Sequence, residues 1–314
     1  MTVSNVFRGK GKVSPATRDR VLHSIQALGY HPDPRALRLK GAAIARVGLI
    51  YFDVESMFIN GTIAAVSLAA AERGLQLLVR KSSNATPAQA FALADDLVAA
   101  GAEAIVLIPP FAELLAEGSG ERSVAVPMVA LATAAALPGI STVRIDNFEA
   151  AFSLTEKLVL KGRRRIGLAG GPLNHSDSRA RLEGYRAALQ KHALPVAEGL
   201  CRHGDFTFAS GVEIGEMLLG TDAPPDAIVS ANDDMAAGVL WAAHRMGVAV
   251  PAELSVTGFD DTLLATRVWP ALTTVRQPVA VMAGRALDLA IEMRMAGDAR
   301  DVVLPFTMVE RGST

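Results

Sequence analysis

The feature that most constrains the fold is a regular alternation of short apolar runs and amphipathic segments, which fills the chain from residue 46 onward. Runs such as 47–51 and 104–108 are apolar throughout, as in strands that are buried on both faces. The segments between them, such as 148–161, repeat their apolar residues at helical spacing. Strands of this kind separated by helices predict an α/β fold built on parallel sheets.

The alternation runs twice, and its second series begins near residue 148. Strands are expected at 47–51, 77–79, 104–108, 128–131, 143–145, 166–169, 227–229 and 254–258, and helices at 61–73, 87–100, 148–161, 179–191, 209–219 and 235–246. Two such series in tandem predict two doubly wound lobes. Ligands of these folds bind beyond the carboxyl ends of the strands, so the cleft between the lobes is the expected site.

Charge is unevenly distributed, although the chain of 314 residues carries a net charge of only −1. Residues 1–46 hold nine Lys and Arg side chains against two Asp, a net charge of +7, which leaves −8 for the other 268 residues. A basic arm is typical of a segment that meets a polyanion. A merely solvated basic tail is the weaker interpretation, because the same arm carries helix signals.

Two short helices are expected in the basic arm. Residues 1–9 read as the latter part of one helix, and residues 14–28 begin with a Ser-Pro start signal and repeat apolar residues at helical spacing. Two short helices cannot bury their apolar faces on each other alone. We therefore expect a further helix before Met1, lost through a start assigned at an internal methionine or through a natural truncation. Residues 29–41 then form a cationic joint.

Other functional classes find little support. The single cysteine, Cys201, permits no intrachain disulfide and fits a reducing compartment. No apolar run reaches the length of a membrane span and no signal-peptide core opens the chain, so the cytoplasm is the expected location. Signatures of serine hydrolases, zinc proteases, Walker loops and dinucleotide-binding turns are missing, and the histidines lack metal-ligand spacing. We expect no enzymatic activity, metal or cofactor.

A series of motifs in order along the chain resembles the lactose repressor/galactose repressor (LacI/GalR) family. In the arm these are Thr2-Val-Ser-Asn-Val, Gly9-Lys-Gly-Lys-Val-Ser-Pro and Leu28-Gly-Tyr-His-Pro. In the body they are Val47-Gly-Leu-Ile, Ile166-Gly-Leu-Ala-Gly-Gly, Arg181-Leu-Glu-Gly-Tyr, Ala231-Asn-Asp, Gly258-Phe-Asp-Asp and Leu272-Thr-Thr-Val-Arg-Gln. The resemblance covers essentially the whole chain.

The resemblance implies a ligand-responsive, DNA-binding transcription regulator, expected to be a homodimeric repressor. Its body would be two doubly wound lobes of the periplasmic-binding-protein-like type I, preceded by a partial helix-turn-helix headpiece and a hinge. The implied domains are headpiece 1–30, hinge 31–45 and effector-binding and dimerisation domain 46–314. Within the body, the N-lobe would comprise 46–147 plus 277–302 and the C-lobe 148–276 plus 303–314. The family's long C-terminal tetramer-forming helix is not expected.

Contacts with operator DNA are implied for the headpiece and the hinge, if the headpiece is complete. Residues 2–7 would end the recognition helix, which lies in the major groove. There Asn5 would read a base edge, while Thr2 and Ser4 would contact phosphate. Leu39 holds the position of a hinge leucine that wedges between base steps in the minor groove. The chain departs from the family pattern at Leu37, where arginine is usual, and Arg35 and Arg38, which flank Leu37, would contact phosphate instead. Without the resemblance, a solvated helix face and an exposed linker would be the preferred interpretations.

Contacts with a small polar effector, a sugar or sugar derivative being the expected class, are implied for the body. Arg181 holds the place of the family's effector-clamping arginine, whose guanidinium suits paired hydroxyls or a carboxylate. The other implied positions are Asp146, Asn232, Asp260 and Gln277 near strand ends, Phe206 as a stacking aromatic and Phe58 in the apolar wall. Each has a simpler reading: Asp146 could cap a helix, Asp260 could shape a turn and Phe206 could belong to the core.

Two other functions are compatible with parts of this pattern. A sugar solute-binding protein without DNA binding would share the two-lobed fold, but it would need an export signal and would not need the basic arm. A sugar-metabolising enzyme is disfavoured because the chain carries no catalytic constellation.

Overall fold

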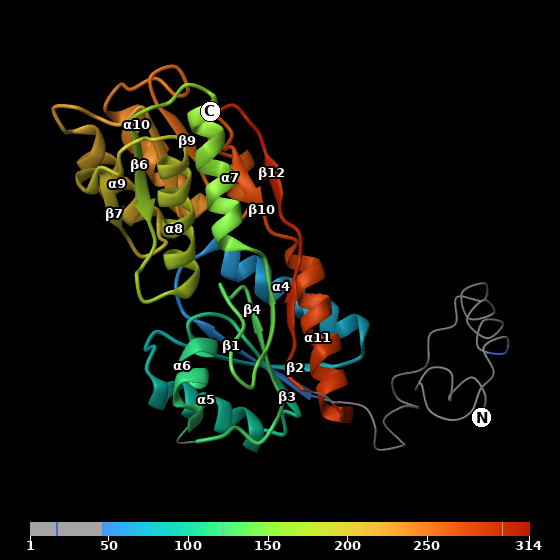
Figure 1. Ribbon diagram of the computed structural model, residues 1–314. Helices are drawn as coiled ribbons and strands as arrows, with labels where there is room; N and C mark the ends of the chain where they lie inside the picture. Colours follow the sequence, from blue (N-terminus) through green and yellow to red (C-terminus); the bar gives the residue numbers. More distant parts are fainter. Residues whose placement is uncertain (1–16, 18–45, 121, 297) are drawn as a thin grey trace. The chain divides into compact units, whose positions relative to one another are not determined.

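The computed structural model describes residue 17 and residues 46–120, 122–296 and 298–314 (Figure 1). The body of the protein is therefore described almost throughout. Apart from Thr17, the expected headpiece and hinge lie outside the described residues. The same is true of the implied DNA contacts, which are Thr2, Ser4, Asn5, Arg35, Arg38 and Leu39.

The first lobe is built on a six-stranded sheet in which every pairing is parallel. Its strands, in spatial order, are β11 (Asp301–Val303), β5 (Ser141–Arg144), β4 (Met128–Leu131), β3 (Ala104–Leu107), β1 (Arg46–Phe52) and β2 (Gln76–Ser82). Helices α4 (Met57–Glu72) and α11 (Val279–Ala296) pack on one face. Helices α5 (Pro87–Ala99) and α6 (Phe111–Glu117) pack on the other, so the central strands are apolar on both sides.

The second lobe is built on a four-stranded parallel sheet. Its strands, in spatial order, are β7 (Cys201–His203), β6 (Ile166–Gly170), β8 (Ala227–Ser230) and β9 (Ser255–Thr257). One face is covered by α7 (Asn147–Leu160) and α8 (Ser176–Lys191), the other by α9 (Phe208–Leu219) and α10 (Asp233–Arg245). A separate antiparallel pair joins β10 (Thr274–Arg276) to β12 (Thr307–Val309). Short 3-10 turns lie at Gly118–Gly120, Glu198–Leu200 and Leu263–Thr266.

The predicted α/β class and both parallel-sheet lobes are present (Figure 1). Thr86 caps α5, because its hydroxyl accepts from Gln89 N at 3.3 Å. The helix expected at 61–73 begins earlier, at Met57, where the hydroxyl of Ser56 caps it by accepting from Ile59 N. Helices α6 and α11 and strands β7, β10, β11 and β12 were not predicted. Within the described residues, no helix is long and apolar enough to cross a membrane.

Candidate ligand-binding cavity

A cavity of about 390 Å³ lies between the lobes. Residues that follow the carboxyl ends of strands in both sheets line it, as expected for doubly wound folds. Its apolar lining consists of Phe52, Val54, Phe58, Ile59, Ile108, Pro109, Ala132, Pro172 and Phe206. Its polar lining consists of Ser56, Asn174, His175, Asp177, Arg181, Asp205, Asn232 and Asp260. An apolar cavity with a few convergent polar groups is the usual form of a small-molecule site.

Arg181 is the best-anchored polar group of the cavity. It lies on α8 and is only 7% exposed. Its Nε donates to Asn147 Oδ1 at 2.9 Å, and its NH1 donates to the carbonyl of Ala231 at 2.5 Å. The guanidinium also stacks on the ring of Phe259, 3.7 Å from the centroid. These contacts hold the side chain in one position before any ligand arrives, which lowers the entropic cost of binding.

Asp260 supplies a buried carboxyl group next to the cavity. Burial raises its pKa well above the ordinary value, against the opposing effect of the Arg181 guanidinium. Gln277 donates from Nε2 to Asp260 Oδ1 at 2.7 Å and so fixes the carboxyl orientation. A carboxyl held in this way can accept from or donate to a ligand hydroxyl.

An aromatic pair borders the same cavity. The rings of Phe206 and His175 meet edge to face with centroids 5.5 Å apart. Burial lowers the pKa of His175, and nearby Asp177 only partly opposes that effect, so the imidazole is mostly neutral at neutral pH. Asn232 donates from Nδ2 to the carbonyl of Phe206 at 2.9 Å while its Oδ1 accepts from Met235 N, which caps α10.

Unusual backbone conformations concentrate at this cavity. Ala132, Phe206 and Asp260 line it and have φ of 61°, 69° and 104°. Residues with side chains rarely adopt such values, and those that do cluster at ligand sites, where the surrounding structure enforces them. The surrounding structure thus holds the cavity lining in backbone conformations that these residues would not prefer by themselves.

Two hydrogen-bonded contacts join the lobes beside the cavity. Ser176 at the start of α8 donates to Glu113 Oε1 at 2.6 Å and accepts from Ala134 N at 3.3 Å. On the other side, Met57 N donates to Asp234 Oδ2 at 3.2 Å. Burial raises the pKa of Glu113, although the Ser176 hydrogen bond opposes it, and burial raises that of Asp234 to about 6.

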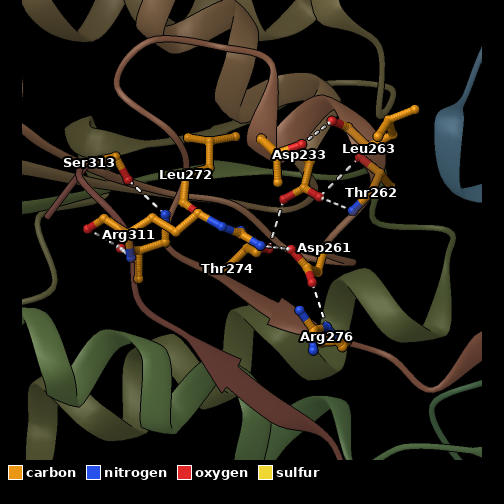
Figure 2. Close-up of polar contacts among 11 residues, drawn as sticks. Asp233, Asp261, Thr262, Leu263, Leu272, Thr274, Arg276, Arg311 and Ser313 are labelled. Carbon is orange, nitrogen blue, oxygen red and sulfur yellow. Dashed lines mark hydrogen bonds and ion pairs between the residues drawn. The ribbon is translucent and has the colours of Figure 1, made fainter.

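A polar network behind the cavity wall fixes the loop that carries Asp260. Asp233 is buried and accepts from Thr262 N, Thr262 Oγ1 and Thr274 Oγ1 at 2.7, 3.1 and 2.7 Å. Asp261 accepts from Arg276 Nε and Arg311 NH2, each at 2.5 Å (Figure 2). Consecutive side chains, those of Asp260 and Asp261, therefore serve different purposes: the first lines the cavity and the second anchors the loop.

Comparison with known proteins decides the family. The model of the "Bacterial regulatory proteins, lacI family" matches residues 1–33, and that of the "Periplasmic binding protein-like domain" matches residues 155–314. The HTH-type transcriptional regulator AscG of Escherichia coli (strain K12) is 31% identical over 95% of this chain and 89% of its own length. This chain belongs to the LacI family. Catabolite control protein A of Priestia megaterium is also 31% identical, over 100% of this chain and 95% of its own.

Solved structures of LacI-family proteins share the fold. The Lac repressor dimer bound to operator and the anti-inducer ONPF superposes with a TM-score of 0.78 at 25% identity, covering 99% of this chain and 94% of its own. The CelR–cellobiose complex gives a TM-score of 0.76 at 28% identity over the same shares. The chain is therefore a DNA-binding transcriptional regulator with an effector-binding domain, in a family of regulators rather than enzymes.

The LacI-family body brings together five of the seven predicted effector residues. Those that line the cavity are Phe58, Arg181, Phe206, Asn232 and Asp260. Gln277 adjoins them through its bond to Asp260. Asp146 is not brought into the cavity: it is exposed, and its Oδ1 accepts from Glu149 N at 3.0 Å to cap α7. This is the simpler reading that the sequence also allowed.

Sequence reasoning missed several polar groups of the LacI-family cavity. Asn147, the residue after Asp146, is 1% exposed and takes the place beside Arg181. His175, Asp177 and Asp205 also line the cavity without having been predicted. The available signal was their position, since His175 and Asp205 lie between a strand end and the next helix and Asp177 lies in the first turn of α8. Among the described residues, no group of His, Cys, Asp and Glu could hold a metal ion.

Proposed function

We propose that this LacI-family regulator is a repressor whose cavity binds a sugar or a sugar derivative, and that the bound ligand controls operator binding through the hinge. The observation that carries the proposal is the fixed Arg181 guanidinium, which faces a cavity walled by Phe206 and other apolar side chains. Hydroxyl groups of a sugar suit the guanidinium and the carboxyl and amide groups, and the apolar face of a sugar ring suits an aromatic wall.

The names of related proteins support the same ligand class. One related structure is a complex of CelR with cellobiose, and another is a Lac repressor bound to ONPG. The cavity volume of about 390 Å³ is at the lower end of the usual range for small-molecule sites. A monosaccharide or a small disaccharide is the size that we propose.

The proposed division of the chain gives each part a role. A headpiece at 1–30 would contact DNA through Thr2, Ser4 and Asn5, and a hinge at 31–45 would contact it through Arg35, Arg38 and Leu39. The body would comprise an N-lobe of 46–147 plus 277–302 and a C-lobe of 148–276 plus 303–314. In a homodimer, ligand-dependent closure of the lobes would change the spacing of the two hinges, which biases operator binding as allostery requires.

The test of this proposal has two readouts, ligand binding and operator binding, and the second uses a chain with a complete headpiece. A panel of sugars and sugar derivatives is first screened by thermal shift, because a ligand that binds only the native state raises stability. Fluorescence anisotropy then measures operator affinity with and without each hit, at a fixed salt concentration. We expect at least one sugar to raise the melting temperature and to change operator affinity. Sugars that leave both quantities unchanged would contradict the proposal.

The role of the hinge is tested separately with Leu39→Ala, made in a chain with a complete headpiece. A leucine wedge opens a base step and bends the duplex, so its loss should weaken operator affinity and reduce DNA bending in a gel-shift phasing assay. Effector affinity without DNA should stay the same, because the substitution lies outside the body. Equal bending by variant and parent would remove Leu39 from this role.

A further inference from the structure

We infer that the cavity selects a ligand without negative charge, and that Asp177 is the residue that excludes anions. This inference rests on the proposed function of the cavity and concerns the chemical class of its ligand. Phosphorylated sugars, sugar acids and nucleotides would be rejected, whereas their uncharged counterparts would bind.

The charges that line the cavity are the first reason. Arg181 is the one cation among the described lining residues, and it shares the lining with three carboxyl groups, those of Asp177, Asp205 and Asp260. His175 adds no positive charge at neutral pH because burial lowers its pKa. Burial alone would raise the pKa of Asp205, but hydrogen bonds from Thr207 and Ser210 outweigh it and hold the pKa below the ordinary value. The lining is therefore not positive, even if Asp260 is uncharged.

The engagement of Arg181 is the second reason. Its Nε and NH1 are taken by Asn147 Oδ1 and the carbonyl of Ala231. Its remaining nitrogen, NH2, lies 3.6 Å from Asp177 Oδ2, and both side chains are largely buried, with 8% and 13% of their surface exposed. The positive charge that would attract a phosphate or a carboxylate is thus already balanced inside the protein.

The helix ends at the cavity are the third reason. Helices α4, α8 and α10 all begin there, and helix N-termini ordinarily attract anions. Here the protein fills these positions with its own acceptors. Asp177 Oδ1 accepts from Ser178 N at the start of α8, and Asp234 Oδ2 accepts from Met57 N at the start of α4. Asn232 caps α10, whose first turn also contains Asp233.

Asp177 takes part both in the contacts of Arg181 and in the occupation of a helix N-terminus. Its Oδ2 faces the Arg181 guanidinium, while its Oδ1 faces the start of α8. An anionic ligand would have to displace this carboxylate or lie beside it in a site of reduced dielectric, where like charges repel strongly. An uncharged ligand can instead accept from Arg181 NH2 and donate to Asp177, and so satisfies both groups.

The experiment compares matched pairs by isothermal titration calorimetry on the full chain. The pairs are glucose and glucose 6-phosphate, ribose and ribose 5-phosphate, and adenosine and AMP. For every pair that binds, we expect the phosphorylated member to bind at least about tenfold more weakly than its neutral partner, a difference of about 1.4 kcal/mol or more. Asp177→Asn retains an oxygen that can accept from Ser178 N and removes the negative charge. It should therefore reduce the affinity difference between the neutral and phosphorylated members of a pair by about tenfold or more.

Glu213→Gln is the matched control, because it removes one negative charge from an exposed position on α9 outside the lining. The affinity difference between neutral and phosphorylated members of a pair should be unchanged in this variant. A phosphorylated member that binds wild-type protein as tightly as its neutral partner would overturn the inference and leave the proposed ligand site standing. An unchanged affinity difference in Asp177→Asn would remove Asp177 from the role. If no member of any pair binds, and the sugar panel also fails, the proposed function itself is contradicted.

Discussion

The hydroxyl of Ser176 donates to Glu113 Oε1 over 2.6 Å, and this bond joins α8 of the second lobe to α6 of the first. The same hydroxyl accepts from Ala134 N. Ser176 therefore connects the lobes at two points beside the cavity without contributing to the cavity lining. Such a contact stabilises this arrangement of the lobes independently of any ligand.

Ser176→Ala should loosen this connection. Loss of the hydroxyl leaves a buried carboxyl oxygen and a backbone amide without their partner, which costs roughly 1–3 kcal/mol of unfolding free energy. The ligand-free protein should also show a larger radius of gyration in small-angle X-ray scattering, because open lobes become more populated. Ser67→Ala, at an exposed position of α4, is the control. A variant with the stability and radius of wild type would show that the contact does not hold the lobes.

Asp233 should make stability depend on pH. Burial raises its pKa from 3.8 to about 7, although three hydrogen bonds from Thr262 and Thr274 oppose the shift. A raised pKa means that the group favours folding fully below pH 3.8 and loses this contribution as pH rises through about 7. Asparagine does not titrate, so Asp233→Asn does not lose this contribution. As pH rises between those limits, its unfolding free energy relative to that of wild type should therefore increase by roughly 2–4 kcal/mol.

Urea denaturation of both proteins at several pH values measures this difference. The Asn side chain can accept from Thr262 and donate to the Thr274 hydroxyl, so its fold should be retained. Asp222→Asn, at an exposed position, should show the same pH dependence as wild type. If the difference in unfolding free energy between Asp233→Asn and wild type stayed constant over this pH range, Asp233 would not titrate within the range.

The two arginines that hold Asp261 should contribute unequally. The Arg311 side chain is 17% exposed and also donates to the carbonyl of Leu272 at 2.8 Å, whereas the Arg276 side chain is 55% exposed. Arg311→Ala should lower the free energy of unfolding by roughly 2–3 kcal/mol, because a largely buried ion pair loses a partner. Arg276→Ala should cost less than about 1 kcal/mol. If chemical denaturation showed the same loss of unfolding free energy for both variants, burial would not determine how much each arginine contributes.

Much of the fold could be predicted because its central strands are buried on both faces. Runs such as 104–108 and 227–229 are apolar throughout and are too short for typical helices, which favours strands buried on both faces. The order β11-β5-β4-β3-β1-β2 could not be predicted, since pairing depends on how distant segments pack. Helix α11 was missed although it packs against α4, because its apolar residues are spread around much of its circumference.

The sequence predicted which loops form the site, but not which side chains of those loops point into it. Arg181 and Asp260 were found through their motifs, and both line the cavity. Asp146 and Asn147 are adjacent in sequence, yet only Asn147 reaches Arg181. Which of two neighbouring polar side chains points inward depends on where α7 begins, and helix starts are set within one or two residues by capping. The preference for Asp146 followed from the motif and not from geometry.

Isothermal titration calorimetry with Arg181→Ala tests whether Arg181 anchors the ligand. The titrant is the sugar that gives the largest thermal shift with wild-type protein. Arg179→Ala, an exposed arginine two residues earlier on α8 and outside the cavity lining, is the matched control. We predict that Arg181→Ala weakens binding by at least about tenfold, because ligand hydroxyls and buried carboxyl groups lose their donor, while Arg179→Ala leaves it unchanged. Wild-type affinity in a folded Arg181→Ala protein would contradict this anchoring role.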